Sequence, residues 1–308
     1  MRRFGMHVSP SCSRVRQLVV ALASSLLCLG TAKSAPSPAP SPTPHHLRNI
    51  SARADVQQDA NVLIGGFIVD GSGAKDFLVR AIGPSLSAGG VLLTGRLADP
   101  VLELYTGDSS VPVAVNDDWK ESQQSAIAAT GIAPANDRES AILRHLSPGR
   151  YTAIVRGKGG ATGTGLVEVY ELTATADPKL ANISARGLVQ PGPNPLIAGL
   201  IAGGGDGSDA TVHVIVRALG PSLSAYSIPM PLPDPTLELF DGNGNVVAAN
   251  DNWMDGPFLE IQATGFAPPD EREAVVIADL RAGGYTAVVR GKEQARGTAL
   301  VEVYDVRR

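Results

Sequence analysis

Leu166-Val-Glu-Val-Tyr170 alternates apolar residues with a charge, and the same five residues return as Leu300-Val-Glu-Val-Tyr304, 134 positions later. A short run of β-branched and aromatic residues with a charge at an alternating position is typical of an antiparallel strand that is buried on one face. Two further pairs of segments share this character, 101–105 with 236–240 and 151–156 with 285–290. The sequence therefore predicts an all-β fold made from two copies of one unit.

The repeat extends over most of the chain of 308 residues. Asn49-Ile-Ser-Ala-Arg53 returns as Asn182-Ile-Ser-Ala-Arg186, and a Gly-Pro-Ser-Leu-Ser block follows a strand pattern in both halves. Each copy has about 125 residues, the usual size of a folding domain. We predict two tandem antiparallel β-sandwich domains of jelly-roll type, with about seven or eight strands each. Copy 1 is residues 47–172, copy 2 is residues 180–308, and 173–179 is the linker between them. Short helices are expected only near 121–129 and 258–263.

The N-terminus resembles a bacterial export signal. Four arginines precede an uncharged apolar run at 18–29, and small residues follow it. We predict a signal peptide over 1–34 and a proline-rich extended linker over 35–46. The apolar run is too short to remain as a membrane-spanning helix, so no integral span is expected after cleavage. The protein is thus predicted to be secreted, to the periplasm, the cell surface or the medium.

Removal of residues 1–34 limits the chemistry of the mature chain. Both cysteines, Cys12 and Cys28, lie in this segment, so the mature chain would have no disulfide, no cysteine nucleophile and no thiolate zinc site. The segment also carries five basic residues and no acidic one, so the formal net charge changes from −4 to −9. A charge of this sign argues against nucleic acid as the partner.

Acidic loops are the strongest candidate for a site. Asn116-Asp-Asp118 follows a strand in copy 1, and Asn250-Asp-Asn252 follows its counterpart in copy 2. Clustered carboxylate and amide oxygens on loops suit calcium, which takes 6–8 oxygen ligands. The predicted calcium ligands are Asn116, Asp117, Asp118, Asn250, Asp251 and Asn252. The alternative is that these side chains cap turns and short helices.

A tryptophan follows each acidic loop directly. Trp119 and Trp253 are candidate ligand-binding residues, because an exposed indole can stack on a sugar ring. The alternative is that each tryptophan closes one end of the core. Strand charges such as Arg80 and Glu168 have two similar interpretations, a polar binding face or a row of cross-strand ion pairs.

A catalytic constellation shared by the copies is not evident. His145 and His213 are not at equivalent positions; aspartates, Asp279 and Asp76, stand where the other copy has its histidine. A shared histidine triad is therefore not expected. Ser85 in Gly-Pro-Ser-Leu-Ser lacks the second glycine of a nucleophile elbow, which favours a turn. We therefore predict that the protein is not an enzyme.

The block from Asp234 to Trp253, followed by 280–290, resembles the bacterial pre-peptidase C-terminal domain, and 99–119 with 146–156 resembles it more weakly. The resemblance covers roughly half of each copy and implies a jelly-roll sandwich without catalytic residues. Some relatives of that family bind calcium or a polymeric substrate. Carried over, it implies calcium-proximal roles for Asp117 with Asp118 and for Asp251 with Asn252. Each whole copy is also similar to tandem modules of uncharacterised secreted bacterial proteins.

These observations predict a secreted, non-catalytic protein that serves adhesion or ligand binding at the cell surface or in the extracellular matrix. Its expected partner is an extracellular polysaccharide or protein, and two linked weak sites would gain avidity. The alternative function is a calcium-stabilised carbohydrate-binding module that accompanies a secreted hydrolase. The pattern requires no cofactor, and calcium is the one that it would suit.

Overall fold

The computed structural model describes residues 46–172, 179–203 and 211–306. Most of these residues lie in antiparallel strands, so the predicted all-β fold is confirmed. The predicted signal peptide at 1–34 and most of the two predicted linkers lie outside the described residues. Copy 1 contains β1 (His46–Val56), β2 (Leu63–Asp70), β3 (Lys75–Ile82), β4 (Ser87–Ala88), β5 (Val91–Leu92), β6 (Pro100–Thr106), β7 (Ala114–Asn116), α1 (Gln124–Ala129), β8 (Ser140–Leu146), β9 (Gly149–Gly157) and β10 (Gly163–Glu171). Copy 2 contains β11 (Lys179–Val189), β12 (Leu196–Gly203), β13 (Thr211–Leu219), β14 (Pro235–Asp241), β15 (Val246–Asn250), α2 (Phe258–Thr264), β16 (Ala274–Arg281), β17 (Gly283–Gly291) and β18 (Gly297–Asp305).

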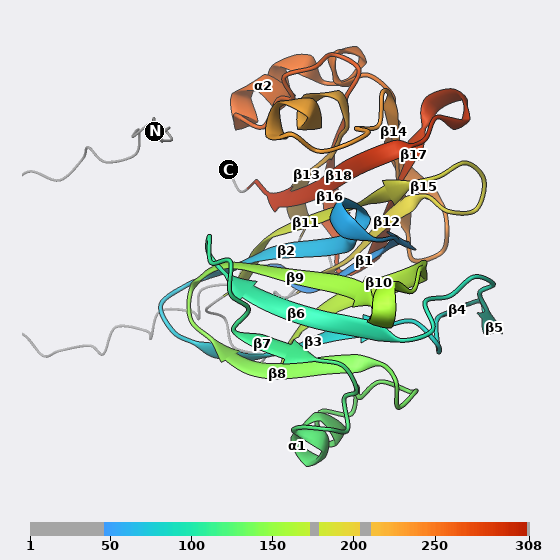
Figure 1. The fold of residues 1–308 in the computed structure, drawn as a ribbon. Coiled ribbons are helices and arrows are strands. Elements are labelled where there is room, and N and C mark those ends of the chain that lie inside the picture. The colour runs from blue at the N-terminus through green and yellow to red at the C-terminus, as the bar shows by residue number, and fades with distance from the viewer. Residues whose placement is uncertain (1–45, 173–178, 204–210, 307–308) are drawn as a thin grey trace, which may run out of the picture. The chain divides into compact units, whose positions relative to one another are not determined.

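The long strands form two antiparallel series that run through both copies (Figure 1). One series is β8-β3-β10-β1-β12-β17-β14-β15, and the other is β16-β13-β18-β11-β2-β9-β6-β7. Each series therefore takes four strands from copy 1 and four from copy 2. The two series meet where β1 and β11 run parallel, with Leu47 opposite Leu180 and Asp55 opposite Leu188.

The copies are joined by strand pairing in both series. β1 of copy 1 pairs with β12 of copy 2, and β11 of copy 2 pairs with β2 of copy 1. This pairing satisfies strand edges that would otherwise be open. The described residues of both copies accordingly belong to one compact unit. The predicted division into separate domains at 47–172 and 180–308 is not confirmed, because the sequence repeat marks the strand sets but not a structural break.

Small residues permit the close approach at this seam, which we define as the β1–β12, β2–β11 and β1–β11 contacts. A side chain at Gly199 would collide with the hydroxyl of Ser51, and one at Gly66 would collide with the hydroxyl of Ser184. A Cβ at Gly187 would lie only 2.5 Å from the Cβ of Ala54. The serine in each Asn-Ile-Ser-Ala-Arg motif is therefore a packing residue of the seam.

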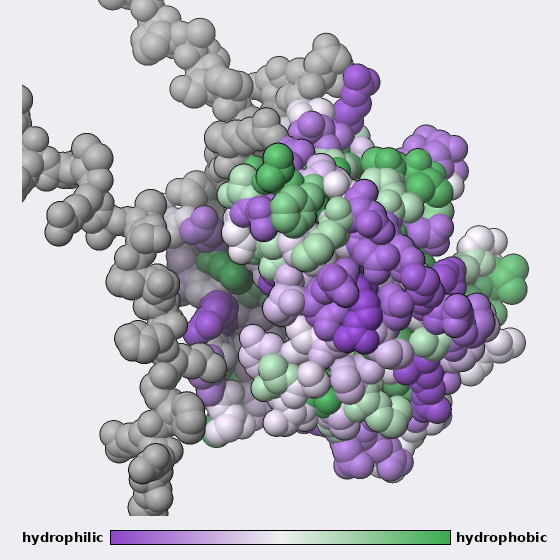
Figure 2. All heavy atoms as spheres, turned by 90° about the horizontal axis from the view of Figure 1, so that it is seen from above, coloured by the Kyte–Doolittle hydropathy of each residue, from purple (hydrophilic) through white to green (hydrophobic). Residues whose placement is uncertain are grey.

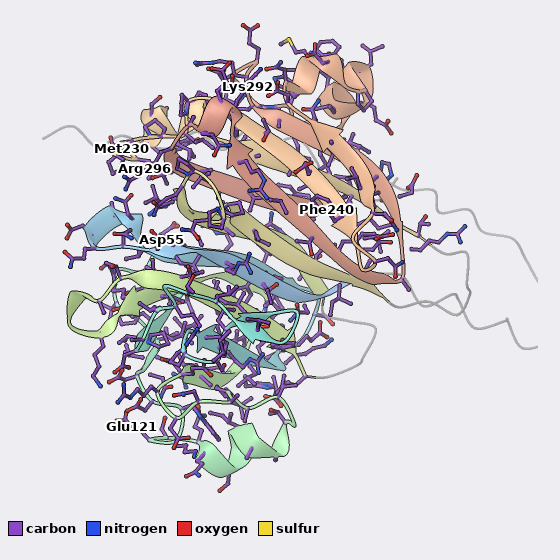
Figure 3. All side chains as sticks on the ribbon, turned by 90° about the vertical axis from the view of Figure 1, so that its right-hand side faces the viewer. Asp55, Glu121, Met230, Phe240, Lys292 and Arg296 are labelled. Carbon is purple, nitrogen blue, oxygen red and sulfur yellow. The ribbon has the colours of Figure 1, made fainter. Side chains whose placement is uncertain are left out.

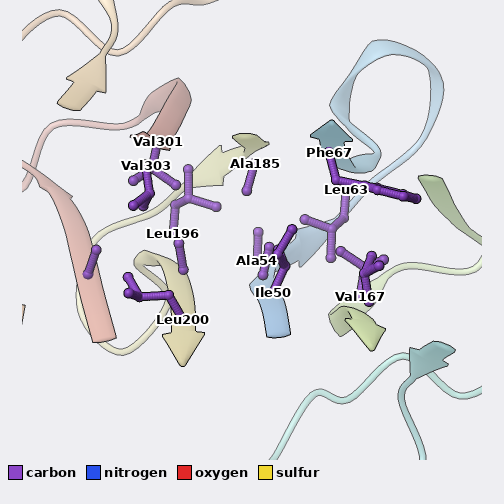
Figure 4. Packing of buried hydrophobic residues seen from close by; sticks show 14 of the residues in the cluster. Ile50, Ala54, Leu63, Phe67, Val167, Ala185, Leu196, Leu200, Val301 and Val303 are labelled. Atoms are coloured by element: carbon purple, nitrogen blue, oxygen red, sulfur yellow. The ribbon is translucent and has the colours of Figure 1, made fainter. Parts of the chain in front are cut away.

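The hydrophobic core also crosses the seam. Strand residues alternate between buried and partly exposed, as in β2 and β6, because successive side chains point to opposite faces. The buried set forms one continuous cluster with members from both copies (Figure 4). Those labelled in the figure include Ile50, Phe67 and Val167 from copy 1 and Leu196 and Val301 from copy 2.

Each copy also has a smaller core on the other face of its strands. In copy 1, Trp119 and Ile127 cover Leu78 and Ala141; in copy 2, the corresponding residues are Trp253, Ile261, Ile215 and Val275. Polar and apolar residues are interspersed on the face that Figure 2 displays. Within the described residues, no helix has both the length and the apolar character needed to cross a membrane.

Candidate functional site: an acidic cluster in copy 1

Three aspartates of copy 1 converge where β6 begins and β7 ends. Asp99 precedes β6, and Asp117 and Asp118 follow β7. One carboxylate oxygen from each lies within 4.8 Å of the others. In addition, the Oδ1 atoms of all three are buried and accept no hydrogen bond from the described residues. We call Asp99, Asp117 and Asp118 the acidic cluster.

The loop that carries two of these aspartates is fixed by its neighbours. Asn116 Oδ1 accepts the backbone N–H of Ala141 at 2.8 Å, and Asn116 Nδ2 donates to the carbonyl of Asp118 at 3.1 Å. Ser140 Oγ lies 2.7 Å from the carbonyl of Asp117 and also within bonding distance of the carbonyl of Pro100, and its single hydrogen donates to one of the two at a time. Because the backbone groups are held in this way, the two carboxylates project together toward Asp99.

Asn116 and Asn250 were predicted as calcium ligands, and the structure gives them a different role. Asn250 repeats the pattern, with Oδ1 accepting from Val275 N at 2.9 Å and Nδ2 donating to the carbonyl of Asn252 at 2.9 Å. Both amide groups are used to shape the loop and do not face the carboxylates as free ligands. This matches the alternative in which Asx side chains hold turns.

Positive charge partly balances the acidic cluster. Lys158 Nζ lies 2.5 Å from Asp117 Oδ2, and this hydrogen bond raises the pKa of Lys158. Burial raises the pKa of Asp99; Lys158 opposes this effect, and Asp117 and Asp118 add to it. The charge of Arg138 also lowers the pKa of Asp99. Three carboxylates thus face one ammonium and one guanidinium group, which leaves a net negative site with oxygen atoms still available. Such a group can hold a hard cation.

Copy 2 has the same arrangement with one carboxylate fewer. Asp234 and Asp251 correspond to Asp99 and Asp117, and each has a buried Oδ1 without a partner among the described residues. Lys292 Nζ lies 2.6 Å from Asp251 Oδ2 and 3.8 Å from Asp234 Oδ2. Asn252 takes the place of Asp118 and donates from Nδ2 to Asp255 Oδ2 at 3.3 Å.

The sequence predicted two of the three clustered residues and missed the third. Asp99 and Asp234 were predicted only as the first residues of the segments that resemble the pre-peptidase C-terminal domain. Each is followed by a proline that begins a strand, β6 in copy 1 and β14 in copy 2. That repeated Asp-Pro pair was the available signal. It was overlooked because Asp99 is separated from Asp117 along the chain and joins it only through the pairing of β6 with β7.

The two tryptophans are buried, so neither presents a ring face to solvent. Their exposed fractions are 7% for Trp119 and 4% for Trp253. Trp119 Nε1 donates to the carbonyl of Asn136, and Trp253 Nε1 to that of Asp270, each at 3.2 Å. Trp253 also stacks on Phe258 with ring centroids 5.3 Å apart. This placement agrees with the alternative of a plug over the core and does not support stacking on a sugar.

A fully buried glutamate explains the Gly-Pro-Ser-Leu-Ser motif. Glu139 Oε1 accepts from the backbone N–H groups of Gly83 and Ser85 and from Ser85 Oγ, at 3.1, 2.8 and 2.6 Å. Glu273 makes the same three contacts with Gly220 and Ser222 in copy 2, at 2.9, 3.0 and 2.6 Å. Sequence reasoning did not identify this anchor, whose members lie more than 50 positions apart. The serine is a loop residue with an acidic acceptor.

The strand charges form buried clamps. Arg80 pairs with Glu168 and donates to the carbonyl of Ile132, so it fastens the loop after α1 to the sheet. Arg217 does the same with Glu302, Nε to Oε2 at 2.6 Å, and with the carbonyl of Phe266. The sequence offered two interpretations of these charges, a polar binding face or a row of cross-strand ion pairs. The ion pairs are cross-strand, but they lie mostly out of solvent, so neither interpretation fits fully.

The histidines belong to cross-strand pairs with reversed order. In copy 1, Asp76 on β3 is opposite His145 on β8, at 2.9 Å. In copy 2, His213 on β13 is opposite Asp279 on β16, at 2.7 Å. Each copy therefore has one Asp–His pair at the same place in the sheet, with the two residues exchanged between the strands. The sequence does not show that the two strands lie side by side.

Comparisons with known proteins add no name to this arrangement. No family model matches the chain, and no curated protein matches it, so the resemblance to the pre-peptidase C-terminal domain stays a prediction. Among solved structures, the chain is similar to one in the atomic structure of Sulfolobus Turreted Icosahedral Virus. That match has 10% identity and a TM-score of 0.24, and it covers 85% of this chain and 90% of the viral chain.

Proposed function

We propose that this protein is an exported, non-catalytic binding protein that serves adhesion or ligand binding, and that copy 1 binds calcium through Asp99, Asp117 and Asp118. The observation that carries the calcium proposal is the convergence of three carboxylates whose Oδ1 atoms are buried and without partners. Buried carboxylate oxygens are costly unless a cation or donor satisfies them.

The chemistry of the cluster favours calcium over zinc. All three candidate ligands are hard oxygen donors on loops, and calcium accepts irregular oxygen coordination completed by water. Zinc prefers histidine and cysteine, and no such side chain is in the group. The ion would join the start of β6 to the loop after β7, so its effect would be to stabilise that end of copy 1.

The non-catalytic part of the proposal is supported by what the shared polar residues do. The glutamate anchors, the arginine clamps and the loop asparagines occur in both copies, and each is occupied in holding a loop. A polysaccharide or protein outside the cytoplasm is the proposed partner. The alternative, a carbohydrate-binding module accompanying a hydrolase, keeps the calcium site but loses its predicted sugar face, because Trp119 and Trp253 are buried.

Calorimetric melting of the chain without residues 1–34 tests the calcium proposal. Added calcium is expected to raise the melting temperature, because the ion binds the folded state, and a chelator should reverse the rise. Asp99→Asn should lose most of the rise. Asp137→Asn serves as the matched control, since Asp137 is an exposed acid paired with Lys120 outside the cluster. An unchanged melting temperature in wild type would rule the site out.

The binding role needs its own experiment. The mature protein is screened for retention on immobilised polysaccharides and extracellular matrix proteins, with calcium present, and retention of at least one is expected. Turnover that persists through purification and disappears with one point substitution would instead make the protein an enzyme.

A further inference from the structure

A small cavity lies at the seam between the copies. Its volume is about 80 Å³. Copy 1 contributes Arg53, Asp55, Thr94 and Thr164 to its lining, and copy 2 contributes Asn194 and Pro195. Figure 3 shows Asp55 on the blue strand β1, where the strands of the two copies adjoin. We call this space the seam cavity, and it exists only because the two copies are joined.

One residue of the repeated Asn-Ile-Ser-Ala-Arg motif remains unexplained by packing. Asn49 Nδ2 donates to the carbonyl of Val169 at 3.3 Å, and Ile50 and Ala52 are core residues. Ser51 packs over Gly199 across the seam. Arg53 has no comparable structural task, although it recurs as Arg186 in copy 2.

Both arginines are charged groups without a counter-charge. Burial alone lowers the pKa of Arg53 and of Arg186, with no acid acting in the opposite direction. The Nε atom of Arg186 is buried and has no hydrogen-bond partner in the described part of the chain. Across the strands, Arg53 is opposite Leu166 and Ile197, both apolar. Arg53 lines the cavity and is partly exposed, so water reaches its guanidinium, and an oxyanion bound there would replace that water with a charged acceptor.

Asp55 does not supply that acceptor. Asp55 Oδ2 accepts from Gln57 Nε2 at 2.6 Å and from Gln190 Nε2, so one glutamine from each copy holds the carboxylate. No ion pair joins it to Arg53 among the described residues. The cavity lining therefore contains Arg53 without an ion-pair partner among the described residues, together with Thr94, Thr164 and Asn194, whose side chains carry hydroxyl and amide groups.

We propose that the seam cavity binds an oxyanion group through Arg53, either as a small free anion or as the uronate or sulfate group of an acidic glycan. A guanidinium presents two parallel N–H donors to a carboxylate or sulfate, which is its strongest mode of hydrogen bonding. The hydroxyl and amide groups offer further donors, and the volume suits one such group rather than a whole sugar. The glycan form deepens the proposed binding function and rests on it, whereas binding of the free anion does not.

The test is melting of the intact mature protein in sodium sulfate or sodium glucuronate, with a chelator present and the ionic strength held constant with sodium chloride. A saturable rise in melting temperature is expected for wild type. Arg53→Gln should weaken binding about tenfold or more, the usual effect of removing a charge-assisted hydrogen bond. Arg150→Gln is the control, because it removes the same charge from an exposed side chain and should bind as wild type does.

Asp55→Asn is a second variant, for the case in which Arg53→Gln does not fold. It removes a negative charge from the cavity lining and should tighten oxyanion binding several-fold. Binding of both anions supports the glycan form, and binding of sulfate alone supports the free anion. No saturable rise in wild type, equal binding by Arg53→Gln, or no change in Asp55→Asn overturns the inference. Retention on a matrix without any oxyanion effect would leave the proposed function standing and remove only this inference.

Discussion

The acidic cluster of copy 1 and its counterpart in copy 2 share their scaffold and differ in their charge. Asn116 and Asn250 make the same two hydrogen bonds, and Lys158 and Lys292 approach the same aspartate. Copy 2 nevertheless has Asn252 in place of Asp118. The loop geometry is therefore independent of the third carboxylate, which indicates that this carboxylate serves something other than the fold.

A second difference points the same way. The hydroxyl of Ser140 ties the carbonyls of Asp117 and Pro100 to β8 by donating to one or the other, whereas Ala274 takes this position in copy 2 and cannot donate. The copy 1 loop is thus both more acidic and more firmly held. Preorganised ligands lower the cost of binding an ion, so copy 1 is the better candidate for a metal site.

The largest expected effect concerns the glutamate anchors. Glu139→Ala should cost about 3 kcal/mol or more in free energy of unfolding, because it leaves several buried donors unsatisfied. Glu273→Ala should cost about 1 kcal/mol less, since Glu139 Oε2 also accepts from Asn136 N at 3.1 Å while Glu273 Oε2 has no partner among the described residues. Urea denaturation measures both values.

Serine variants provide the control for this pair. Ser85→Ala and Ser222→Ala remove one equivalent hydrogen bond each, at 2.6 Å in both copies, and should cost similar, smaller amounts. If Glu273→Ala lost as much stability as Glu139→Ala, the additional hydrogen bond from Asn136 N to Glu139 Oε2 would contribute no measurable stability.

The next effect is at the centre of the seam, where Ala54 meets Gly187. Gly187→Ala should destabilise the protein by about 1–3 kcal/mol, because two methyl groups would then compete for one space. Adding Ala54→Gly to this variant exchanges the two residues and should recover most of the loss. Thermal unfolding measures the stability of the single and double variants. A Gly187→Ala protein as stable as wild type would mean that β1 and β11 do not approach as closely as the structure shows at Ala54 and Gly187.

The strand pattern was sufficient to predict the all-β fold, because alternation of buried and exposed residues is a local property. The two short α-helices were also predicted, whereas the 3-10 helix at Pro221–Tyr226 was not. Strand partnership between copies was not predictable in this way. Ser51 and Gly199 lie far apart in the chain, and their fit becomes visible only when β1 pairs with β12. The equal copies in the sequence suggested two separate sandwiches, but equality of sequence says nothing about which edge strands pair.

The candidate site was partly predictable for the same reason. Asp117 and Asp118 are adjacent in the sequence, whereas Asp99 reaches them through tertiary structure. The sequence left the tryptophans with two interpretations, ligand binding or a plug over the core, because sequence alone does not distinguish an aromatic that covers a core from one that faces solvent. Their position beside the smaller cores, with the indole N–H groups donating to loop carbonyls, decides between the two.

An exchange of charge between the copies tests the difference in calcium binding. Asp118→Asn should weaken binding at copy 1 about tenfold or more, because ligand charge sets calcium affinity. Asn252→Asp should create or strengthen a site at copy 2 by restoring the third carboxylate beside Asp234 and Asp251. Titration calorimetry counts the sites in each variant. If Asn252→Asp adds no binding, the firmer loop held by Ser140, and not the charge, distinguishes copy 1.

The smallest expected effect tests where the copies are alike. Burial raises the pKa of Tyr170 and of Tyr304 to about 12, and the neighbouring Glu168 and Glu302 add to the rise. Because the folded pKa lies above the unfolded value near 10, each tyrosine contributes stability that is complete below pH 10 and is lost as the pH rises toward 12. Burial also raises the pKa of Tyr105 and of Tyr151, so late ionisation alone does not identify the pair. Absorbance titration of tyrosinate should include two groups that ionise near pH 12, and Tyr170→Phe and Tyr304→Phe should each remove one. If either tyrosine ionised near pH 10, the arginine clamps of the two copies would differ in burial. The structural equivalence of the two copies would then not include the loops that the clamps hold, at Ile132 and Phe266.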